Sequence, residues 1–332
     1  MAEEAAPVSY EDLALIEDEF NDIDLDIMRI QFEKSKEVYQ KRAAAVAKIP
    51  SFWPLVFEQV PLEIDQFILP QDSRLFAESL VSMEVTRPGI VAGEGEPRSL
   101  RFRFEFQPNE DFEDTVLEKS FWYRRAKDGY SGLVSEPVKI HWKKGKDLTQ
   151  GLSDMAVALF EARKKAGDMT SKSVSEYAPL REKVEHWNGS NTSFFTWFGW
   201  VSDRRWISAE ESEQANKKEE EKKKQRKEGQ TVGEEEPSDE DLDEEDDQDV
   251  EVHEAGEQIA VTLAEEIWPK AIEFFTGAQE DEELSELDFE EDDEDMEDED
   301  GPVDIRALVG DQGSKKSKRE SGGAPPSKKQ KK

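Results

Sequence analysis

The chain has 332 residues, of which 35% are hydrophobic and 37% are charged, and its formal net charge is −36. Globular domains contain about 25% charged residues on average, so a large part of this chain cannot belong to a hydrophobic core. Cysteine is absent, which excludes a disulfide framework, a thiol nucleophile and a zinc site built on thiolates.

The charge is distributed unevenly along the chain. Residues 234–300 contain 34 acidic residues and a single basic one, Lys270, whereas residues 301–332 contain nine basic and three acidic residues. The sequence therefore predicts a mildly acidic body over residues 1–233, followed by a strongly acidic arm and a basic carboxyl end.

Several kinds of site are not expected. The amino end lacks the positive region and the apolar stretch of a signal peptide, and no run approaches the roughly 20 apolar residues of a membrane span. His141, His186 and His253 lie far apart in sequence, so we interpret them as isolated polar residues rather than as metal ligands. We expect no metal, no cofactor and no membrane partner.

Residues 9–48 predict one long helix. Ser9 followed by Asp12 resembles a capping box, and no glycine or proline interrupts the segment before Pro50. About 39 residues at 1.5 Å each give a helix roughly 58 Å long, which exceeds the diameter of a small domain. Residues 1–8, which precede it, are expected to be disordered.

Two apolar rows follow this helix. The first has the 3-4 spacing of a coiled-coil seam and consists of Leu13, Ile16, Phe20, Ile23, Ile27 and Ile30. The second repeats every seven residues and consists of Leu25, Phe32, Tyr39 and Val46. At about 100° per residue the rows occupy opposite faces, so we predict that the first pairs with a second copy of the chain and the second packs on the chain's own domain. The alternative is a helix packed wholly inside its own domain.

Four runs in the middle of the chain predict an antiparallel sheet. Apolar and polar residues alternate in residues 80–86 and 100–106, and strand-like runs follow at 115–123 and 138–142. Turn residues separate the runs, among them Asp128-Gly129. We expect a meander with one buried face and one face in contact with water.

Helices are expected around this sheet at residues 54–68, 152–166 and 258–275, which gives an α+β domain. Between the last two lies a dense aromatic cluster, Phe194-Phe195-Thr196-Trp197-Phe198 with Trp200. We interpret the cluster as core packing. The alternative is a stacking platform for single-stranded nucleic acid, which needs a cationic field, whereas the net charge here has the opposite sign.

Five motifs in chain order resemble the nucleosome assembly protein family, and most closely its SET branch. They are Ile49-Pro50-Ser51-Phe52-Trp53, Phe104-Glu105-Phe106 with Asn109, Phe112, Leu117 and Lys119, the run WKKGKDLT at 142–149, SFFTWF at 193–198, and Glu265-Glu266-Ile267-Trp268-Pro269 with Phe274-Phe275. The ordered set is far more specific than any one motif. The resemblance implies a histone chaperone that forms a homodimer through the long helix, each chain carrying an α+β earmuff domain with a four-stranded antiparallel sheet covered by helices.

The chain departs from SET-like relatives in three places. Asp111 and Asp114 stand where those relatives carry a tyrosine and an asparagine, which makes this turn more acidic. Residues 151–191 and 201–256 are longer than the branch needs. The expected organisation is a dimerisation helix at 9–48, an earmuff domain at 49–200 and 257–276, a charged and largely disordered insertion at 201–256, an acidic tail at 277–300 and a basic disordered end at 301–332.

By the same resemblance, acidic residues near this turn, on the last helix and in the tail are expected to contact histones. They are Glu113, Asp114, Glu265, Glu266, Glu273, Glu290, Glu291, Asp292 and Asp293. The alternative for each one is an ordinary exposed carboxylate, and for the acidic runs as a whole a solvated segment that only improves solubility.

The acidic segments suggest how such a protein would work. A polyanion competes with DNA phosphates for lysine and arginine side chains, so it can hold a histone off nonspecific DNA. Each exposed ion pair contributes about 0–1 kcal/mol and is screened beyond roughly 8 Å at physiological salt, which keeps the histone releasable. We expect no strong direct binding of DNA.

Two basic clusters at the carboxyl end are typical of a nuclear localisation signal. They consist of Lys315, Lys316, Lys318 and Arg319, and of Lys328, Lys329, Lys331 and Lys332. We predict a nuclear protein with an import receptor as a partner, and shuttling to the cytoplasm is left open. The alternative is a basic arm that folds back on the acidic block or touches DNA.

Nothing in the sequence indicates an enzyme, since it contains neither a glycine-rich phosphate loop nor an HExxH motif. The predicted function is that of a histone chaperone that binds core histones and supports nucleosome assembly. The alternative is a nuclear regulatory scaffold that inhibits or activates another enzyme, a phosphatase or a histone acetyltransferase.

Overall fold

The computed structural model describes residue 8 and residues 10–93, 95–187, 192–228 and 249–280. Its elements are, in chain order, α1 (Tyr10–Val46), α2 (Phe52–Glu58), α3 (Leu62–Asp65), α4 (Pro70–Ser79), β1 (Leu80–Thr86), α5 (Pro88–Val91), β2 (Leu100–Phe106), β3 (Val116–Arg125), β4 (Ser131–Ser135), α6 (Leu152–Ala166), α7 (Tyr177–His186), η1 (Phe194–Gly199), α8 (Ala209–Lys227), α9 (Gly256–Thr262) and η3 (Leu263–Ile267). A further helical segment covers residues 271–280. Ser9, the expected capping residue of the first helix, lies outside the described residues.

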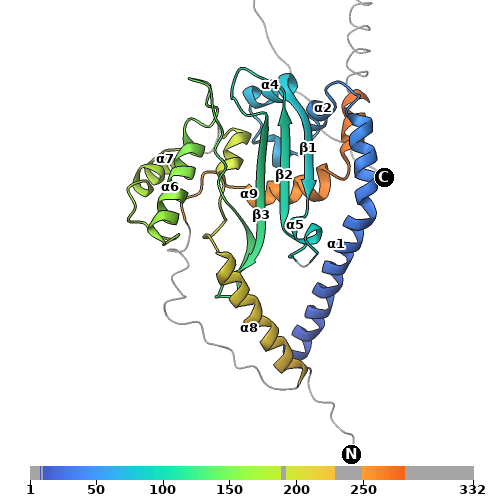
Figure 1. The fold of residues 1–332 in the computed structure, drawn as a ribbon, viewed down its shortest axis with the longest axis vertical. Helices are drawn as coiled ribbons and strands as arrows, with labels where there is room; N and C mark the ends of the chain where they lie inside the picture. The colour runs from blue at the N-terminus through green and yellow to red at the C-terminus, as the bar shows by residue number, and fades with distance from the viewer. Residues whose placement is uncertain (1–7, 9, 94, 188–191, 229–248, 281–332) are drawn as a thin grey trace, which may run out of the picture. The chain divides into compact units, whose positions relative to one another are not determined.

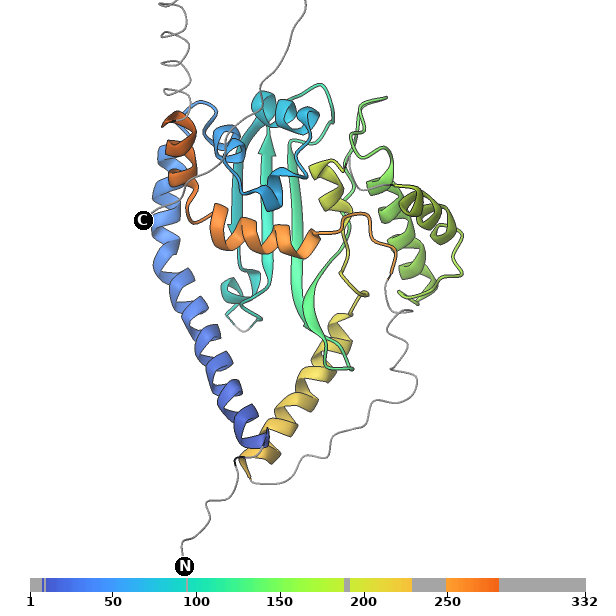
Figure 2. The same ribbon diagram turned by 180° about the vertical axis from the view of Figure 1, so that it is seen from behind.

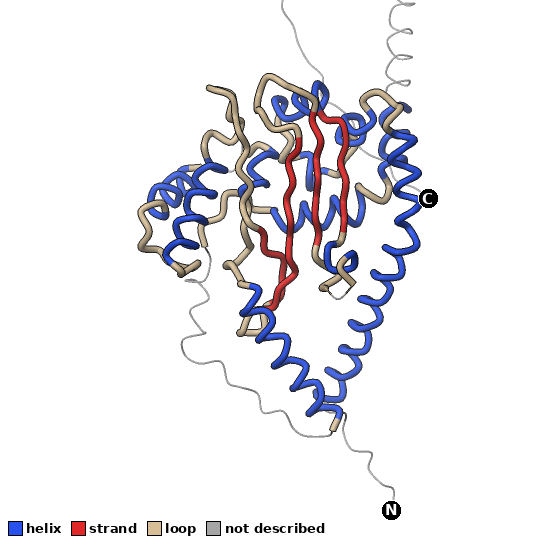
Figure 3. Tube along the Cα trace, in the orientation of Figure 1, coloured by secondary structure: helices blue, strands red, loops and turns tan. Residues whose placement is uncertain are grey.

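The four strands form one antiparallel sheet in the order β1-β2-β3-β4, which confirms the predicted meander (Figures 1 and 3). In β2, Phe102 and Phe104 are fully buried, while Arg101 and Arg103 lie on the opposite face. This alternation fixes the register, because a slip of one residue would carry the arginines into the core.

The prediction of the fourth strand at residues 138–142 is wrong. The strand is β4, which follows β3 after a tight turn in which Gly129 has a φ of 91°. Residues Gly132 to Ser135 are all buried, so β4 lacks the apolar-polar alternation of a half-exposed strand. Residues 138–142 instead contribute an isolated bridge, between Phe112 and Trp142.

The aromatic cluster forms the centre of the core, as predicted. All four aromatic side chains of η1 are fully buried. The ring of Trp197 lies 5.2 Å from that of Phe102 and 5.0 Å from that of Phe121. Rings enclosed in this way cannot stack on nucleic-acid bases, so the alternative interpretation as a base-stacking platform is wrong.

Helices cover one face of the sheet, and Figure 2 shows α9 running across it. The predicted helix at 152–166 is α6, whereas the one at 54–68 is divided into α2 and α3 by Pro61. The helix expected at 258–275 is present as α9, the π-helical turn η3 and the segment 271–280.

The expectation that residues 201–256 are largely disordered is wrong for 201–228 and 249–256, which are folded. Ile207 is fully buried in a small cluster beside β4, and α8 follows it. The Ser208 hydroxyl caps α8 by accepting a hydrogen bond from the backbone N–H of Glu211 at 3.0 Å. Residues 229–248 lie outside the described residues.

The inserted helix α8 connects β3 to the amino half of α1 (Figure 1). Arg226 of α8 lies 3.7 Å from Asp18 of α1 and 3.2 Å from Glu219. Glu219 in turn lies 3.9 Å from Arg125 of β3. A helix that is polar on all sides depends on charged neighbours of this kind, so the chain of ion pairs supports α1 from the side of the sheet.

Replacing Arg226 by alanine is expected to loosen α8 from α1. Loss of a partly buried ion pair costs about 1 kcal/mol, which corresponds to roughly five-fold faster amide hydrogen exchange in α8 and in the amino half of α1. Lys224→Ala is the matched control, because it removes the same charge from an exposed position of the same helix. Equal exchange rates in the two variants would contradict this role of Arg226.

Candidate functional site

The apolar seam of α1 faces water in the single chain. Its six residues, Leu13, Ile16, Phe20, Ile23, Ile27 and Ile30, are 51–65% exposed. A continuous row of large exposed apolar side chains marks a contact with another protein. The seam is therefore free for a second copy, and the alternative of a helix packed wholly inside its own domain is wrong.

The second row of α1 packs on the chain's own domain. Val46 is buried, and the ring of Tyr39 lies 5.4 Å from that of Trp268. Arg42, which lies between Tyr39 and Val46 on α1, is only 8% exposed. Its guanidinium lies 4.2 Å from the centre of the Trp268 ring. These contacts attach the carboxyl half of α1 to the domain, so the amino half carries the exposed seam.

Charge is segregated along α1, a feature that the sequence analysis missed. Residues 10–26 contain eight acidic residues and no basic one, whereas residues 29–48 contain six basic and two acidic residues. Glu17, Glu19 and Asp24 are exposed on the acidic half. The signal was present in the sequence, but averaging the charge over residues 1–233 concealed it.

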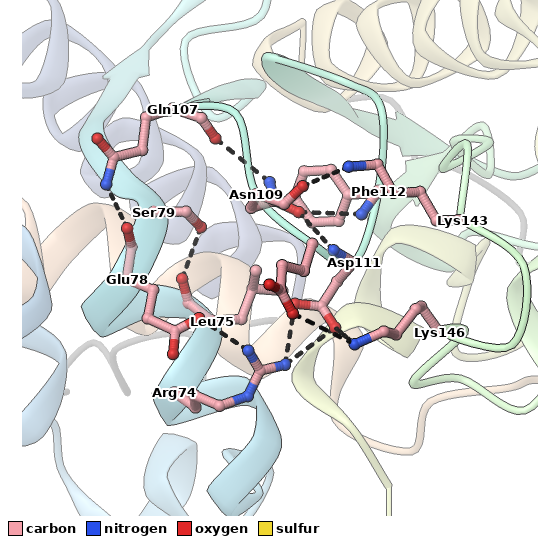
Figure 4. A network of polar contacts seen from close by, with 11 residues as sticks. Arg74, Leu75, Glu78, Ser79, Gln107, Asn109, Asp111, Phe112, Lys143 and Lys146 are labelled. Carbon is pink, nitrogen blue, oxygen red and sulfur yellow. Dashed lines mark hydrogen bonds and ion pairs between the residues drawn. The ribbon is translucent and has the colours of Figure 1, made fainter.

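In the acidic turn after β2, Asp111 is paired with neighbouring cations (Figure 4). Asp111 is buried, and both of its carboxylate oxygens accept hydrogen bonds from Arg74 of α4 at 2.9 Å. Asp114 accepts a hydrogen bond from the backbone N–H of His141 at 2.7 Å and lies 2.9 Å from its ring Nδ1. The interpretation that Asp111 makes the surface of this turn more acidic is therefore wrong, whereas Asp114 is half-buried beside His141 and Glu113 is exposed as predicted.

The structure separates the acidic residues predicted to contact histones. Glu113 and Asp114 follow β2 at the end of the sheet where β1 begins. Glu265 forms an ion pair with Arg87, which follows the other end of β1. A strand of seven residues is about 23 Å long, so these carboxylates form two groups at opposite ends of the sheet.

The remaining residues predicted to contact histones do not connect these two groups of carboxylates. Glu266 lies 3.4 Å from Lys270 and is half-buried, while Glu273 is exposed on the segment 271–280. Glu290, Glu291, Asp292 and Asp293 lie outside the described residues, as do both basic clusters at the carboxyl end. Of the predicted histone-contacting carboxylates that the structure describes, Glu113 and Glu273 are exposed and take part in none of the ion pairs given above.

A buried polar cluster attaches η1 and residues 249–254 to the sheet. Lys119 of β3 donates hydrogen bonds to the carbonyl oxygens of Phe198 at 3.1 Å and Trp200 at 2.8 Å. Glu251 accepts a hydrogen bond from the backbone N–H of Val201 at 2.8 Å. Burial lowers the pKa of Lys119 to about 7 and raises that of Glu251 to about 8, and the attraction between the two charges opposes both shifts.

His253 is buried beside this cluster, with its ring 4.6 Å from that of Phe67. Its Nδ1 accepts a hydrogen bond from the backbone N–H of Ala255 at 3.2 Å. Burial, assisted by the positive charge of Lys119, lowers the pKa of His253 to about 3. The imidazole is therefore neutral in the folded protein.

The protonation of His253 predicts a loss of stability in acid. Between about pH 6.5 and pH 3 the unfolded chain binds a proton at this residue and the folded chain does not, so folding weakens as the pH falls. We expect the stability advantage of the wild type over His253→Asn to shrink by about 1.4 kcal/mol between about pH 7.5 and pH 5.5. Urea unfolding at both pH values measures this difference, and a constant advantage would show that the imidazole is not held neutral.

Other kinds of site are not found in the described part of the chain. No cluster of three or more histidine, aspartate or glutamate side chains there has the arrangement of a metal site. None of the described helices combines the length and the apolar character needed to cross a membrane.

Two curated proteins that are similar to this chain are named after nucleosome assembly proteins. A Schizosaccharomyces pombe protein whose name assigns it to nucleosome assembly is 36% identical over 154 residues, which are 43% of this chain and 61% of that protein. NAP1-related protein 2 of Arabidopsis thaliana is 29% identical over 143 residues, 43% of this chain and 52% of that protein. The matches thus span between half and two thirds of these relatives' length.

Two solved structures are similar to this chain over most of its length. Ccp1 is 26% identical and covers 81% of this chain and 95% of its own, with a TM-score of 0.49. A structure titled as the Vps75 histone chaperone is 21% identical and covers 81% of this chain and 97% of its own, with a TM-score of 0.46.

The family model described as nucleosome assembly protein (NAP) matches residues 3–278. That range includes the long helix, the sheet and both insertions. The chain therefore belongs to the nucleosome assembly protein family, as its five ordered motifs predicted.

Proposed function

We propose that this protein is a histone chaperone that binds core histones, shields their basic side chains from nonspecific DNA and supports nucleosome assembly. The observation that carries the proposal is the match to the nucleosome assembly protein family over residues 3–278. The distribution of charge supports it, since residues 234–300 contain 34 acidic residues. The protein acts by binding and not by catalysis.

Two copies pair through the exposed seam of α1, whose apolar residues run from Leu13 to Ile30. The dimer then presents two earmuff domains on one rigid support.

The acidic tail acts together with the folded domain. A histone that contacts exposed carboxylates such as Glu113 and Glu273 experiences a high local concentration of tail carboxylates, because both belong to the same chain. Each contact is weak and is screened by salt. The cargo is therefore held by many small contributions and passes to DNA, whose denser line of phosphates competes for the same lysines and arginines.

A deposition assay tests this function. Histones and DNA mixed at physiological salt precipitate, and the protein is expected to prevent precipitation and to transfer the histones to the DNA as nuclease-resistant particles. The alternative function, a scaffold that acts on a phosphatase or an acetyltransferase, predicts no effect on histone deposition. Continued precipitation in the presence of the protein would contradict the chaperone proposal.

The basic carboxyl end places the protein in the nucleus under this proposal. Replacing the eight lysine and arginine residues of the two clusters by alanine is expected to move a fluorescent fusion of the full chain from the nucleus to the cytoplasm, because an import receptor recognises such clusters by their charge. Replacing the same number of acidic residues in 281–300 by glutamine is the control. Unchanged nuclear fluorescence in the first variant would assign import to another part of the protein.

A further inference from the structure

A groove lies between the carboxyl half of α1 and the edge of the sheet. It encloses a cavity of about 690 Å³, with Phe32, Lys36 and Ala43 on its α1 side and Val81 and Met83 on its β1 side. Figure 1 shows β1 as the strand nearest to α1. Neither the seam nor the acidic residues described above form this groove, so it is a separate surface of the domain.

The sheet edge in this groove is open. β1 pairs with β2 on one side, and among the described residues no backbone hydrogen bond joins its other side to α1 or to another element. Val81 is 55% exposed although it belongs to a strand. An unpaired strand edge with an apolar side chain beside it is a template for an added strand, which supplies the missing backbone hydrogen bonds.

A buried cation lines the same groove. Arg42 is only 8% exposed, and its guanidinium lies 4.2 Å from the ring centre of Trp268 and 4.8 Å from that of Tyr39. One of its terminal nitrogens donates to the carbonyl oxygen of Trp268, whereas Nη2 is buried and has no acceptor among the described residues. Because Nη2 is itself buried, the positive charge of Arg42 acts on an occupant of the groove through space and not by direct contact.

The charges of the groove favour an acidic occupant. Its lining contains Lys36, Arg42 and Arg103 against Glu84 and Glu105, so it carries a small positive excess in a chain whose net charge is −36. Arg103 and Glu105 already pair with each other. Since Arg42 fills the space between the aromatic rings, a cationic side chain finds no vacant aromatic cage here. A basic histone segment is therefore a poor fit.

A second copy held on the seam leaves the groove accessible. At about 100° per residue, Phe32, Lys36 and Ala43 point away from the side of α1 that carries Ile23, Ile27 and Ile30. The groove and the seam thus use opposite faces of one helix. A second copy bound through the seam of α1 therefore does not fill the groove.

We propose that the groove binds an extended acidic segment of a partner protein, which adds to β1 as a fifth strand of the sheet. Every second side chain of the segment packs against Val81 and the aliphatic wall of α1, and a carboxylate between them pairs with the exposed ammonium group of Lys36. This site goes beyond histone binding, because it lets the chaperone hold a second protein while its acidic surfaces hold histones.

A short peptide tests the proposal on the full-length dimer. The probe is a fluorescent nine-residue peptide in which valine alternates with threonine around one central glutamate. We expect a dissociation constant of roughly 10 μM by fluorescence anisotropy, at least ten-fold weaker binding when lysine replaces the glutamate, and no binding when alternate amides are N-methylated. Equal binding of the glutamate and lysine peptides, or no binding of the glutamate peptide at about 1 mM, would overturn the proposal.

Matched variants locate the binding. Val81→Lys places a charge in the groove at a position that is 55% exposed, and Ile272→Lys does the same at a position that is 53% exposed and lies outside the groove. We expect the first to weaken peptide binding at least ten-fold and the second to leave it unchanged, while both bind histones like the wild type. Peptide binding that is equal in the two variants would place the peptide elsewhere and refute the groove, whatever the result for histones.

Discussion

Replacing Ile23 and Ile27 of α1 together by glutamate converts the protein from a dimer into a monomer of 38.0 kDa. Each dimer then carries four carboxylates at positions that otherwise pack against apolar side chains, and the buried charges find no partner in the seam. We expect the dissociation constant of the dimer to rise by roughly a thousand-fold or more, from the cost of placing charges at buried apolar positions. Sedimentation equilibrium measures the mass of the species directly.

The matched control adds the same charge to the same helix outside the seam, through Asn21→Glu and Gln40→Glu. Both positions are exposed, so this variant should stay dimeric. The fold of the monomeric variant should survive, because Ile23 and Ile27 are 52% and 53% exposed in the single chain and contribute little to its core. A dimer that persists with glutamate at both positions would mean that α1 associates through another face.

Removing residues 281–300 weakens histone binding mainly at low salt. The segment contains 15 acidic residues, whose contacts are long-range and unshielded in dilute buffer. We expect a loss of affinity of roughly 10- to 100-fold at about 50 mM salt and of less than about three-fold at about 300 mM salt. The deletion begins at residue 281 because Ala278, in the last described helical segment, is buried.

A variant of equal length provides the control for this deletion. It replaces the 15 acidic residues of 281–300 by glutamine and asparagine, which removes the charge and keeps the chain. It should bind histones as weakly as the deletion, whereas a permuted segment with the original composition should bind like the wild type. Equal losses at both salt concentrations would show that the tail does not act electrostatically.

The parts of the fold predicted from the sequence are those with a clear periodicity. The rows of α1 repeat at helical spacing, and β2 alternates phenylalanine with charged residues, so burial on one face leaves a visible pattern. β4 has no such pattern because it is buried on both sides, although Asp128-Gly129 marked the turn before it. Residues 138–142 alternate like a strand, yet they lie beside the sheet as an extended segment.

The insertion shows why composition alone misleads. Residues 209–227 are so rich in charge that they were expected to be disordered, but Ser208 and Glu211 provide a cap and the acidic first turn and basic last turn complement the helix dipole. α8 packs on α1 through contacts such as the ion pair between Arg226 and Asp18. These two residues are 208 positions apart in the sequence. No local pattern reports that contact.

The sequence predicted the seam of α1 and the acidic character of the candidate site, but not which carboxylates are paired. The seam was found because its spacing is local. The neutralisation of Asp111 by Arg74, and of Glu265 by Arg87, depends on which strands and helices meet, so a carboxylate that seems free in the sequence can be paired in the fold. The separation of Glu113 from Glu265 likewise follows from the direction of β1, which only the folded sheet fixes.

The most direct test of the account is the equilibrium binding of purified core histone pairs to the full-length dimer. We predict dissociation constants below about 1 μM for at least one pair at about 50 mM salt, with affinity falling steadily as salt is added. The absence of any association with either histone pair in this dilute buffer would contradict the account at its centre.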